Sequence, residues 1–167
     1  RTRPGAEGDG IADTLVRPMG DATDRPLPRG AVLGLGMMGR HHARLLQSAA
    51  GVTFAGAVDP GGDRFAAVAQ PALVFPTVEA LLEAGGVDFA VVAVPTEDHV
   101  SAVRALADAG VHVLIEKPLA ATVEGGREIL QICERAGIHA AVGFVERCNP
   151  ALLELRLRVQ NGQLGEI

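Results

Sequence analysis

The chain has 167 residues, of which 48% are hydrophobic, and it carries a formal net charge of -5 with an isoelectric point near 5.5. A chain of this length and apolar content can bury a single core, which excludes a wholly disordered polypeptide. The acidic balance, with five Phe and no Trp or Tyr, provides neither a basic surface nor stacking platforms, so we expect no nucleic-acid partner.

The first 28 residues hold four Pro and four Gly among scattered charges and show no sustained helical or strand period. Such a segment buries too little apolar surface to order itself. We therefore expect a flexible leader over 1–28 and a folded domain over 29–145.

From residue 29 onward, short apolar runs alternate with segments of helical length. The predicted strands cover 31–34, 53–58, 73–75, 89–94, 111–115 and 139–143, and the predicted helices cover 38–47, 63–68, 78–83, 97–109 and 123–136. Thr77, Thr96 and Thr122 stand where N-cap residues belong. This alternation predicts the α/β class and a doubly wound parallel sheet of the Rossmann type.

A further helix is predicted after the sixth strand. Asn149 followed by Pro150 is a good helix start, and the apolar residues Leu152, Leu155 and Val159 then recur on one helical face. We expect this helix to end at Gly162 and residues 165–167 to begin another strand. The segment 146–167 is therefore interpreted as a connecting helix and the start of a second, substrate-binding domain that is truncated.

Cysteine usage and hydropathy indicate the compartment in which the protein is expected. Cys133 and Cys148 lack the spacing of a metal site or a redox motif and the density of a disulfide scaffold, so we expect neither a metal nor a catalytic thiol. The longest apolar stretch, 89–94, ends at Pro95, far short of the roughly 18 residues of a membrane span. With no signal-peptide core at the amino terminus, these features indicate a soluble, cytoplasmic protein without a membrane partner.

A glycine motif follows the first predicted strand. Gly34, Gly36 and Gly39 satisfy G-x-G-x-x-G between a strand and a helix, with Met37 and Met38 between the last two glycines. In this pattern the first glycine permits a tight turn, the second lets the backbone approach a diphosphate, and the third allows close packing of helix and strand. The helix N-terminus adds N–H groups and a positive dipole end. We expect all five residues to contact a dinucleotide.

Asp59 ends the second predicted strand, twenty residues beyond Gly39. A carboxylate there can accept hydrogen bonds from the adenosine ribose hydroxyls and would repel a 2'-phosphate, which favours NAD over NADP. The simpler alternative is a turn residue before Pro60. Arg64 could still accept a 2'-phosphate, so NADP is the less favoured alternative.

Arg40, His41 and His42 follow the glycine motif on the first predicted helix. Contact with phosphate is conceivable for one of them, but two of the three side chains must point away from any single ligand. We interpret His41 and His42 as helix-surface or packing residues.

Three further motifs follow later strands: Ala93-Val-Pro-Thr-Glu-Asp-His99, Glu116-Lys117-Pro118 and Glu146-Arg-Cys-Asn-Pro150. Together with the glycine motif, they resemble the Gfo/Idh/MocA family, which includes glucose-fructose oxidoreductase and inositol dehydrogenase. The resemblance runs from about residue 30 to residue 167. Glu-Lys-Pro after a fifth apolar strand is its most specific part.

The resemblance implies that Lys117 lies beside the nicotinamide and the substrate and is the catalytic residue. An amine in that place can hydrogen-bond the reacting hydroxyl, favour alkoxide character and orient the carbon for hydride transfer. Glu116 is then expected to position or tune the lysine within the cofactor site, and Pro118 to set the exit from the strand. The alternative for Lys117 is a solvated lysine in a strand-end loop.

The resemblance also places Pro95, Thr96 and His99 beside the nicotinamide ribose, in the loop and first turn after the fourth strand, where open α/β sheets bind ligands. For Thr96 the alternative is helix capping, and for His99 it is packing against the helix. Arg147 and Asn149 could reach a substrate, although capping already explains Asn149.

Residues 142–151 and 38–44 look most like the members that act on nucleotide-linked sugars, such as UDP-N-acetylglucosamine 3-dehydrogenases. Phe144 and Cys148 depart from that pattern, because those relatives often have His and an aromatic residue at these positions.

The resemblance thus implies an NAD-dependent oxidoreductase that oxidises a secondary hydroxyl of a sugar, nucleotide sugar or cyclitol, and a homo-oligomer in its full-length form. Members of the family have a second domain that supplies the substrate cleft and an acid-base group, so we expect little turnover from this chain alone. Two alternatives stay open: a catalytically inactive NAD-binding module or truncated fragment, and an unrelated nucleotide-binding fold such as a methyltransferase.

Overall fold

The computed structural model describes residues 26–166, so most of the predicted leader and Ile167 lie outside the described residues. Within this range the strands are β1 (Arg29–Leu33), β2 (Thr53–Val58), β3 (Val74–Phe75), β4 (Phe89–Val92), β5 (His112–Ile115) and β6 (Ala140–Val142). All of them are parallel, in the spatial order β3-β2-β1-β4-β5-β6. This is the doubly wound order of dinucleotide-binding domains, as predicted.

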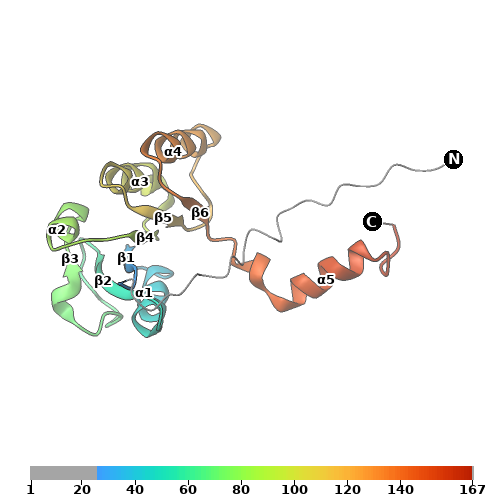
Figure 1. Ribbon diagram of the computed structural model, residues 1–167, viewed down its shortest axis with the longest axis horizontal. Coiled ribbons are helices and arrows are strands. Elements are labelled where there is room, and N and C mark those ends of the chain that lie inside the picture. Colours follow the sequence, from blue (N-terminus) through green and yellow to red (C-terminus); the bar gives the residue numbers. More distant parts are fainter. Residues whose placement is uncertain (1–25, 167) are drawn as a thin grey trace.

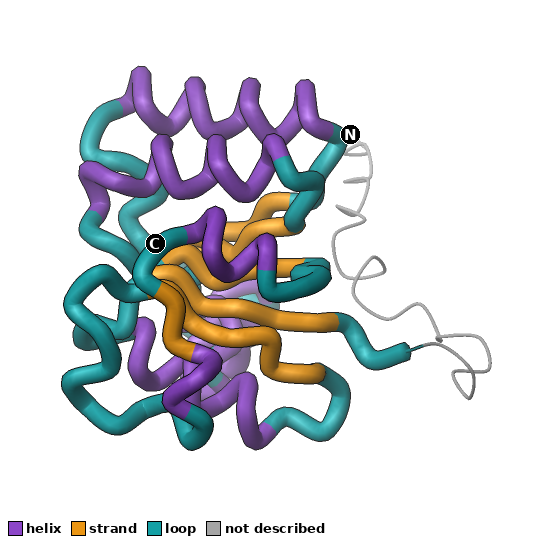
Figure 2. The backbone as a smooth tube through the Cα atoms, turned by 90° about the vertical axis from the view of Figure 1, so that its left-hand side faces the viewer, coloured by secondary structure: helices purple, strands orange, loops and turns teal. Residues whose placement is uncertain are grey.

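Helices cover both faces of the sheet, as Figures 1 and 2 show. The covering helices are α1 (Gly39–Ser48), α2 (Val78–Glu83), α3 (His99–Asp108) and α4 (Val123–Ala136), and a further helix, α5 (Pro150–Gln160), follows them. Alternate residues of β1 enter opposite cores: Ala31 and Leu33 join the core under α2, α3 and α4, whereas Val32 joins the core under α1. Because both faces of the central strands β1 and β4 are buried, these strands are almost continuously apolar.

Three of the predicted N-caps are present. The side-chain oxygens of Thr77, Thr122 and Asn149 accept hydrogen bonds from backbone amides in the first turns of α2, α4 and α5. Thr96, in contrast, is wrong as a cap. It begins a 3-10 turn, Thr96–Asp98, that precedes α3, and no side chain caps that turn or the helix.

The helix predicted over 63–68 does not form. The carboxylate of Asp63 accepts hydrogen bonds from the backbone amides of Phe65 and Val68, and Ala66 has a left-handed backbone with φ of 45°. Gln47 of α1 bonds the carbonyl of Ala67 and the amide of Ala69, each at 2.8 Å. The segment is therefore held onto α1 as an irregular loop that closes the second core.

The carboxyl-terminal part differs from the rest of the domain. A 3-10 turn, Val145–Cys148, leads into α5, which extends away from the sheet (Figure 1) and has no buried residue. The helix ends at Gln160, two residues before the predicted end at Gly162. Residues 165 and 166 are not in a strand.

Candidate functional site

The ends of four neighbouring strands lie level with one another. Leu33 of β1 pairs with Val58 of β2 and Val92 of β4, and Val92 pairs with Ile115 of β5. The residues that follow these four are Gly34, Asp59, Ala93 and Glu116. They consequently leave the sheet at one edge, on both sides of the switch point between β1 and β4, where this fold binds ligands.

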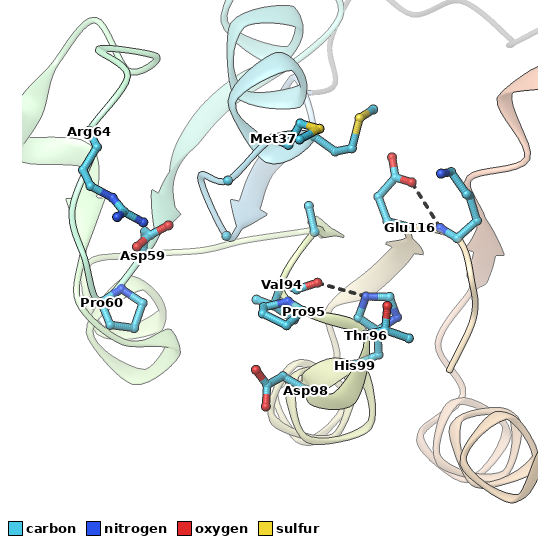
Figure 3. Close-up of a pocket in the computed structure, with 15 residues that line it drawn as sticks. Met37, Asp59, Pro60, Arg64, Val94, Pro95, Thr96, Asp98, His99 and Glu116 are labelled. Carbon is cyan, nitrogen blue, oxygen red and sulfur yellow. Dashed lines mark hydrogen bonds between the residues drawn. The ribbon is translucent and has the colours of Figure 1, made fainter. Parts of the chain in front are cut away.

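A pocket of about 620 Å³ opens at this edge. Its lining includes ten of the eleven predicted site residues: Gly34, Gly36, Met37, Met38, Asp59, Pro95, Thr96, His99, Glu116 and Lys117. Gly39, the eleventh, is buried beneath the glycine-rich turn. Asp59 and Arg64 lie at one end of the pocket and Glu116 at the other, with Val94 and Pro95 between them (Figure 3). The elongated lining is suited to an extended ligand.

Each glycine of the motif meets a different environment. Gly34 has φ of +87°, and a Cβ there would lie 2.6 Å from the carbonyl oxygen of Ala93. A Cβ on Gly39 would overlap the carbonyl oxygen of Gly34, so the close approach of α1 to β1 requires glycine. At Gly36 a Cβ would meet no atom within 4 Å, because this residue borders the pocket.

The start of α1 faces this open space without a side-chain cap and without an acidic residue in its first turn. A helix N-terminus has backbone N–H groups without intrahelical partners and a positive dipole end, and both favour an anion. Together with the bare surface at Gly36, these features fit the diphosphate of a dinucleotide.

Asp59 connects the glycine-rich turn to its own turn. Its Oδ2 accepts a hydrogen bond from the Leu35 amide, and its Oδ1 accepts one from the Gly61 amide, both at 2.8 Å. Each carboxylate oxygen can accept more than one bond, so Asp59 can still bind a sugar hydroxyl. The carboxylate thus stabilises the glycine-rich turn and lines the pocket where the ribose is predicted to bind.

The guanidinium of Arg40 lies over the ring of Phe65, 4.5 Å from its centroid, and the Arg40 Nε has no hydrogen-bond partner in the described part of the chain. The three polar residues after the glycine motif therefore point in different directions. Arg40 packs on the 63–68 segment, His41 is exposed, and His42 turns toward the strand ends.

His42 is the residue that the sequence interpretation missed. Its Nε2 lies 2.7 Å from Oε1 of Glu116, a residue that is only 6% exposed. His42 lies one helical turn after Gly39, on the face of α1 that approaches the strand ends. That spacing was the available signal.

Lys117 is the only lysine in the 167 residues. It follows β5, is exposed, and lines the pocket beside Glu116. Its backbone N–H donates to Oε2 of Glu116 at 3.1 Å, and its peptide bond to Pro118 is cis. Glu116 therefore holds the backbone from which the lysine side chain projects.

His99 is buried, with 1% exposure, and its two ring nitrogens face the carbonyl oxygens of Leu119 and Val94 at 3.1 and 3.2 Å. It ties the loop after β4 to the loop after Pro118, which favours the packing alternative. Contact of His99 with a cofactor stays a prediction.

Arg147 and Asn149 are not brought to the pocket. The Arg147 guanidinium lies 5.2 Å from the centroid of the Phe144 ring. Asn149 caps α5 and donates to Glu146.

The two cysteines have different environments. Burial raises the pKa of the Cys133 thiol in α4, whereas Cys148 is exposed. Because the thiolate is the reactive form, we expect a disulfide reagent at pH 8 to modify Cys148 at least about tenfold faster than Cys133. Ellman's reagent with a Cys148→Ser control measures this difference, and equal rates would contradict the burial of Cys133.

No helix within residues 26–166 combines the length and the apolar character needed to cross a membrane.

The parallel strand order, the glycine-rich turn and the strand-end carboxylate define a dinucleotide-binding domain of the Rossmann type. Residues 29–144 match the family model described as the oxidoreductase family with an NAD-binding Rossmann fold. The chain belongs to this Gfo/Idh/MocA family, and several of the relatives it matches are named dehydrogenases.

Two curated relatives and one solved structure illustrate the similarity. The chain is 30% identical over 142 residues to scyllo-inositol 2-dehydrogenase (NAD(+)) of Bacillus subtilis, covering 83% of this chain and 42% of the relative. It is 35% identical over 130 residues to UDP-N-acetylglucosamine 3-dehydrogenase of Acidithiobacillus ferrooxidans, covering 77% and 40%. The scyllo-inositol dehydrogenase of Lactobacillus casei, solved with NAD(H) and scyllo-inositol, shares the fold with a TM-score of 0.75, 20% identity, and coverage of 85% and 43%. The chain thus spans less than half the length of these relatives.

Proposed function

We propose that this chain forms the NAD-binding part of a dehydrogenase that oxidises a secondary hydroxyl of a sugar, nucleotide sugar or cyclitol, with Lys117 as its catalytic residue. The observation that carries the proposal is the single pocket that contains the glycine-rich turn, Asp59 and Lys117. The relatives named for inositol and UDP-N-acetylglucosamine oxidation support the substrate class.

The chain's own residues divide the work by position along the pocket. The turn at Gly34 and Gly36, with the start of α1, binds the diphosphate, and Asp59 accepts hydrogen bonds from the adenosine ribose. The loop at Pro95 and Thr96 forms the floor between the two ends. When bound, NAD supplies the nicotinamide ring that accepts a hydride.

Lys117 acts on the reacting hydroxyl in two ways. Its neutral amine accepts the hydroxyl proton, and the resulting ammonium stabilises the negative charge that develops on that oxygen. Because the Glu116 carboxylate holds the Lys117 backbone N–H, the lysine side chain starts from a defined point of the backbone at the pocket wall.

Calorimetry with NAD and NADP, followed by an absorbance assay for NADH with inositols and UDP-N-acetylglucosamine, tests the function. We expect the 167-residue chain to bind NAD, and a longer protein that also carries a substrate-binding domain to turn over one of these substrates. Binding without turnover of any sugar or cyclitol in that longer protein would favour the inactive NAD-binding module, and no affinity of the chain for either dinucleotide would overturn the proposal.

Cofactor choice provides a second test at Asp59. We expect Asp59→Ala to weaken NAD binding at least about tenfold more than NADP binding, because the removed carboxylate accepts bonds from the ribose and repels a 2'-phosphate. Asp59→Asn is the control, since its amide oxygen can retain one of the two bonds to the turns. Equal losses for NAD and NADP, measured as dissociation constants, would contradict the ribose contact.

A further inference from the structure

The carboxylate of Glu116 is held by two groups that come from different parts of the chain. Nε2 of His42, in the first turn of α1, lies 2.7 Å from Oε1, and the Lys117 amide donates to Oε2 at 3.1 Å. A carboxylate oxygen only accepts, so the His42 nitrogen is the donor. The His42 side chain is 18% exposed, which places this contact largely out of solvent.

With this arrangement, the Glu116 carboxylate makes no ion pair with the side chain of the adjacent Lys117 within residues 26–166. Glu116 and Lys117 are neighbours and line the same pocket, so their side chains are natural ion-pair partners. Nevertheless, the ion pairs formed within residues 26–166 do not include the Lys117 ammonium, whereas Glu116 pairs with His42. His42 therefore fixes the orientation of a carboxylate whose contacts in the described part of the chain include the Lys117 backbone N–H but not the Lys117 ammonium.

We propose that His42 is a positioning residue whose hydrogen bond keeps the Glu116 carboxylate from pairing with the Lys117 side chain. An adjacent carboxylate favours the charged form of an amine, and an ammonium locked in an ion pair can neither accept a proton nor reach a substrate oxygen. His42 thereby preserves a reactive amine at the pocket wall. The inference rests on the proposed role of Lys117.

The chain allows a direct measurement because Lys117 is its only lysine. Only the neutral amine reacts with an acetyl N-hydroxysuccinimide ester. The acetylation rate of the Lys117 peptide at pH 8, followed by mass spectrometry, therefore measures the fraction of Lys117 whose amine is neutral and accessible. We expect His42→Ala to slow this rate about tenfold, the effect of a shift of about one pH unit in the protonation of an amine near a carboxylate.

Two variants separate this role from a merely structural one. His42→Gln places an N–H donor at a similar reach, and we expect it to react within about twofold of the wild-type rate. In the double variant His42→Ala with Glu116→Gln, no carboxylate remains to pair with Lys117, so we expect the fast rate to return. His41→Ala, an exposed neighbour on the same turn, is the matched control.

The proposal is overturned if His42→Ala reacts at the wild-type rate, or if the slow rate persists in the double variant. Glu116→Gln alone provides a test that does not depend on the folding of a His42 variant. With His42 present we expect it to change the rate less than twofold, and a several-fold acceleration would show that the carboxylate already pairs with Lys117. Because no turnover is needed, failure here is distinct from failure of the proposed dehydrogenase, which Lys117→Ala tests by activity.

Discussion

In a full-length protein that also carries the substrate-binding domain, replacing Lys117 with alanine is expected to lower kcat at least about a hundredfold while leaving the dissociation constant for NAD within about twofold. A positioned group that takes a proton or stabilises a developing oxyanion contributes about 10²–10⁴ to the rate. Lys117 lines the pocket next to Glu116, which lies at the end remote from Asp59 (Figure 3), so we expect the contacts to the diphosphate and the adenosine ribose not to involve the lysine side chain.

Lys117→Arg is the informative control for this experiment. Arginine keeps the positive charge but does not lose its proton in proteins, so it can stabilise an oxyanion without accepting the hydroxyl proton. Comparable losses in Lys117→Arg and Lys117→Ala would assign the effect to proton acceptance. Unchanged turnover in Lys117→Ala would remove this residue from the mechanism.

The 167-residue chain offers a related measurement that needs no substrate. If the nicotinamide lies beside Lys117, saturating NAD should slow acetylation of its amine by about threefold or more, because a bound ligand restricts access of the reagent. The Asp59→Ala variant is the matched control, since it should need more NAD to reach the same protection.

The strand order and the main site residues could be predicted because their signals are local. The glycine motif, the alternation of apolar strands with helices, and the carboxylate after the second strand each occupy a short window of sequence. The register of Leu33, Val58 and Val92 then brings the strand ends to one edge. Parallel strands all end at the same edge of the sheet, whatever the sequence of the helices that connect them.

The features that the sequence interpretation missed depend on partners distant in the chain. Residues 63–68 have helical length, but Asp63 bonds its own turn and Gln47, twenty residues away from Ala67, holds the loop on α1. The contact between His42 and Glu116 joins residues 74 positions apart. Local periodicity does not record such contacts. The spacing after Gly39 could place His42 on the right face of α1, but only the folded chain reveals the irregular loop and the partner of His42, Glu116.

The second large effect is expected from two substitutions in the same glycine motif, one of which should lower NAD affinity and the other the stability of the fold. A Cβ at Gly36 meets no protein atom within 4 Å and the residue has no positive φ, so Gly36→Ala should fold with nearly unchanged stability. The same methyl group occupies the space next to the expected diphosphate. We therefore expect NAD affinity to fall at least about tenfold while the melting temperature stays within about 2 °C.

Gly39→Ala adds the same single carbon three residues later, where it overlaps the carbonyl oxygen of Gly34. Backbone atoms cannot rotate away as a flexible side chain can, so α1 must move from β1 at a cost of about 1–3 kcal/mol, and the melting temperature should fall by about 5 °C or more. Differential scanning fluorimetry and NAD calorimetry on both variants separate the two effects. Equal NAD affinity in Gly36→Ala and wild type would place the diphosphate elsewhere. The methyl group added at Gly36 enters space that the diphosphate is expected to fill, whereas the methyl group added at Gly39 enters space that the Gly34 backbone already fills.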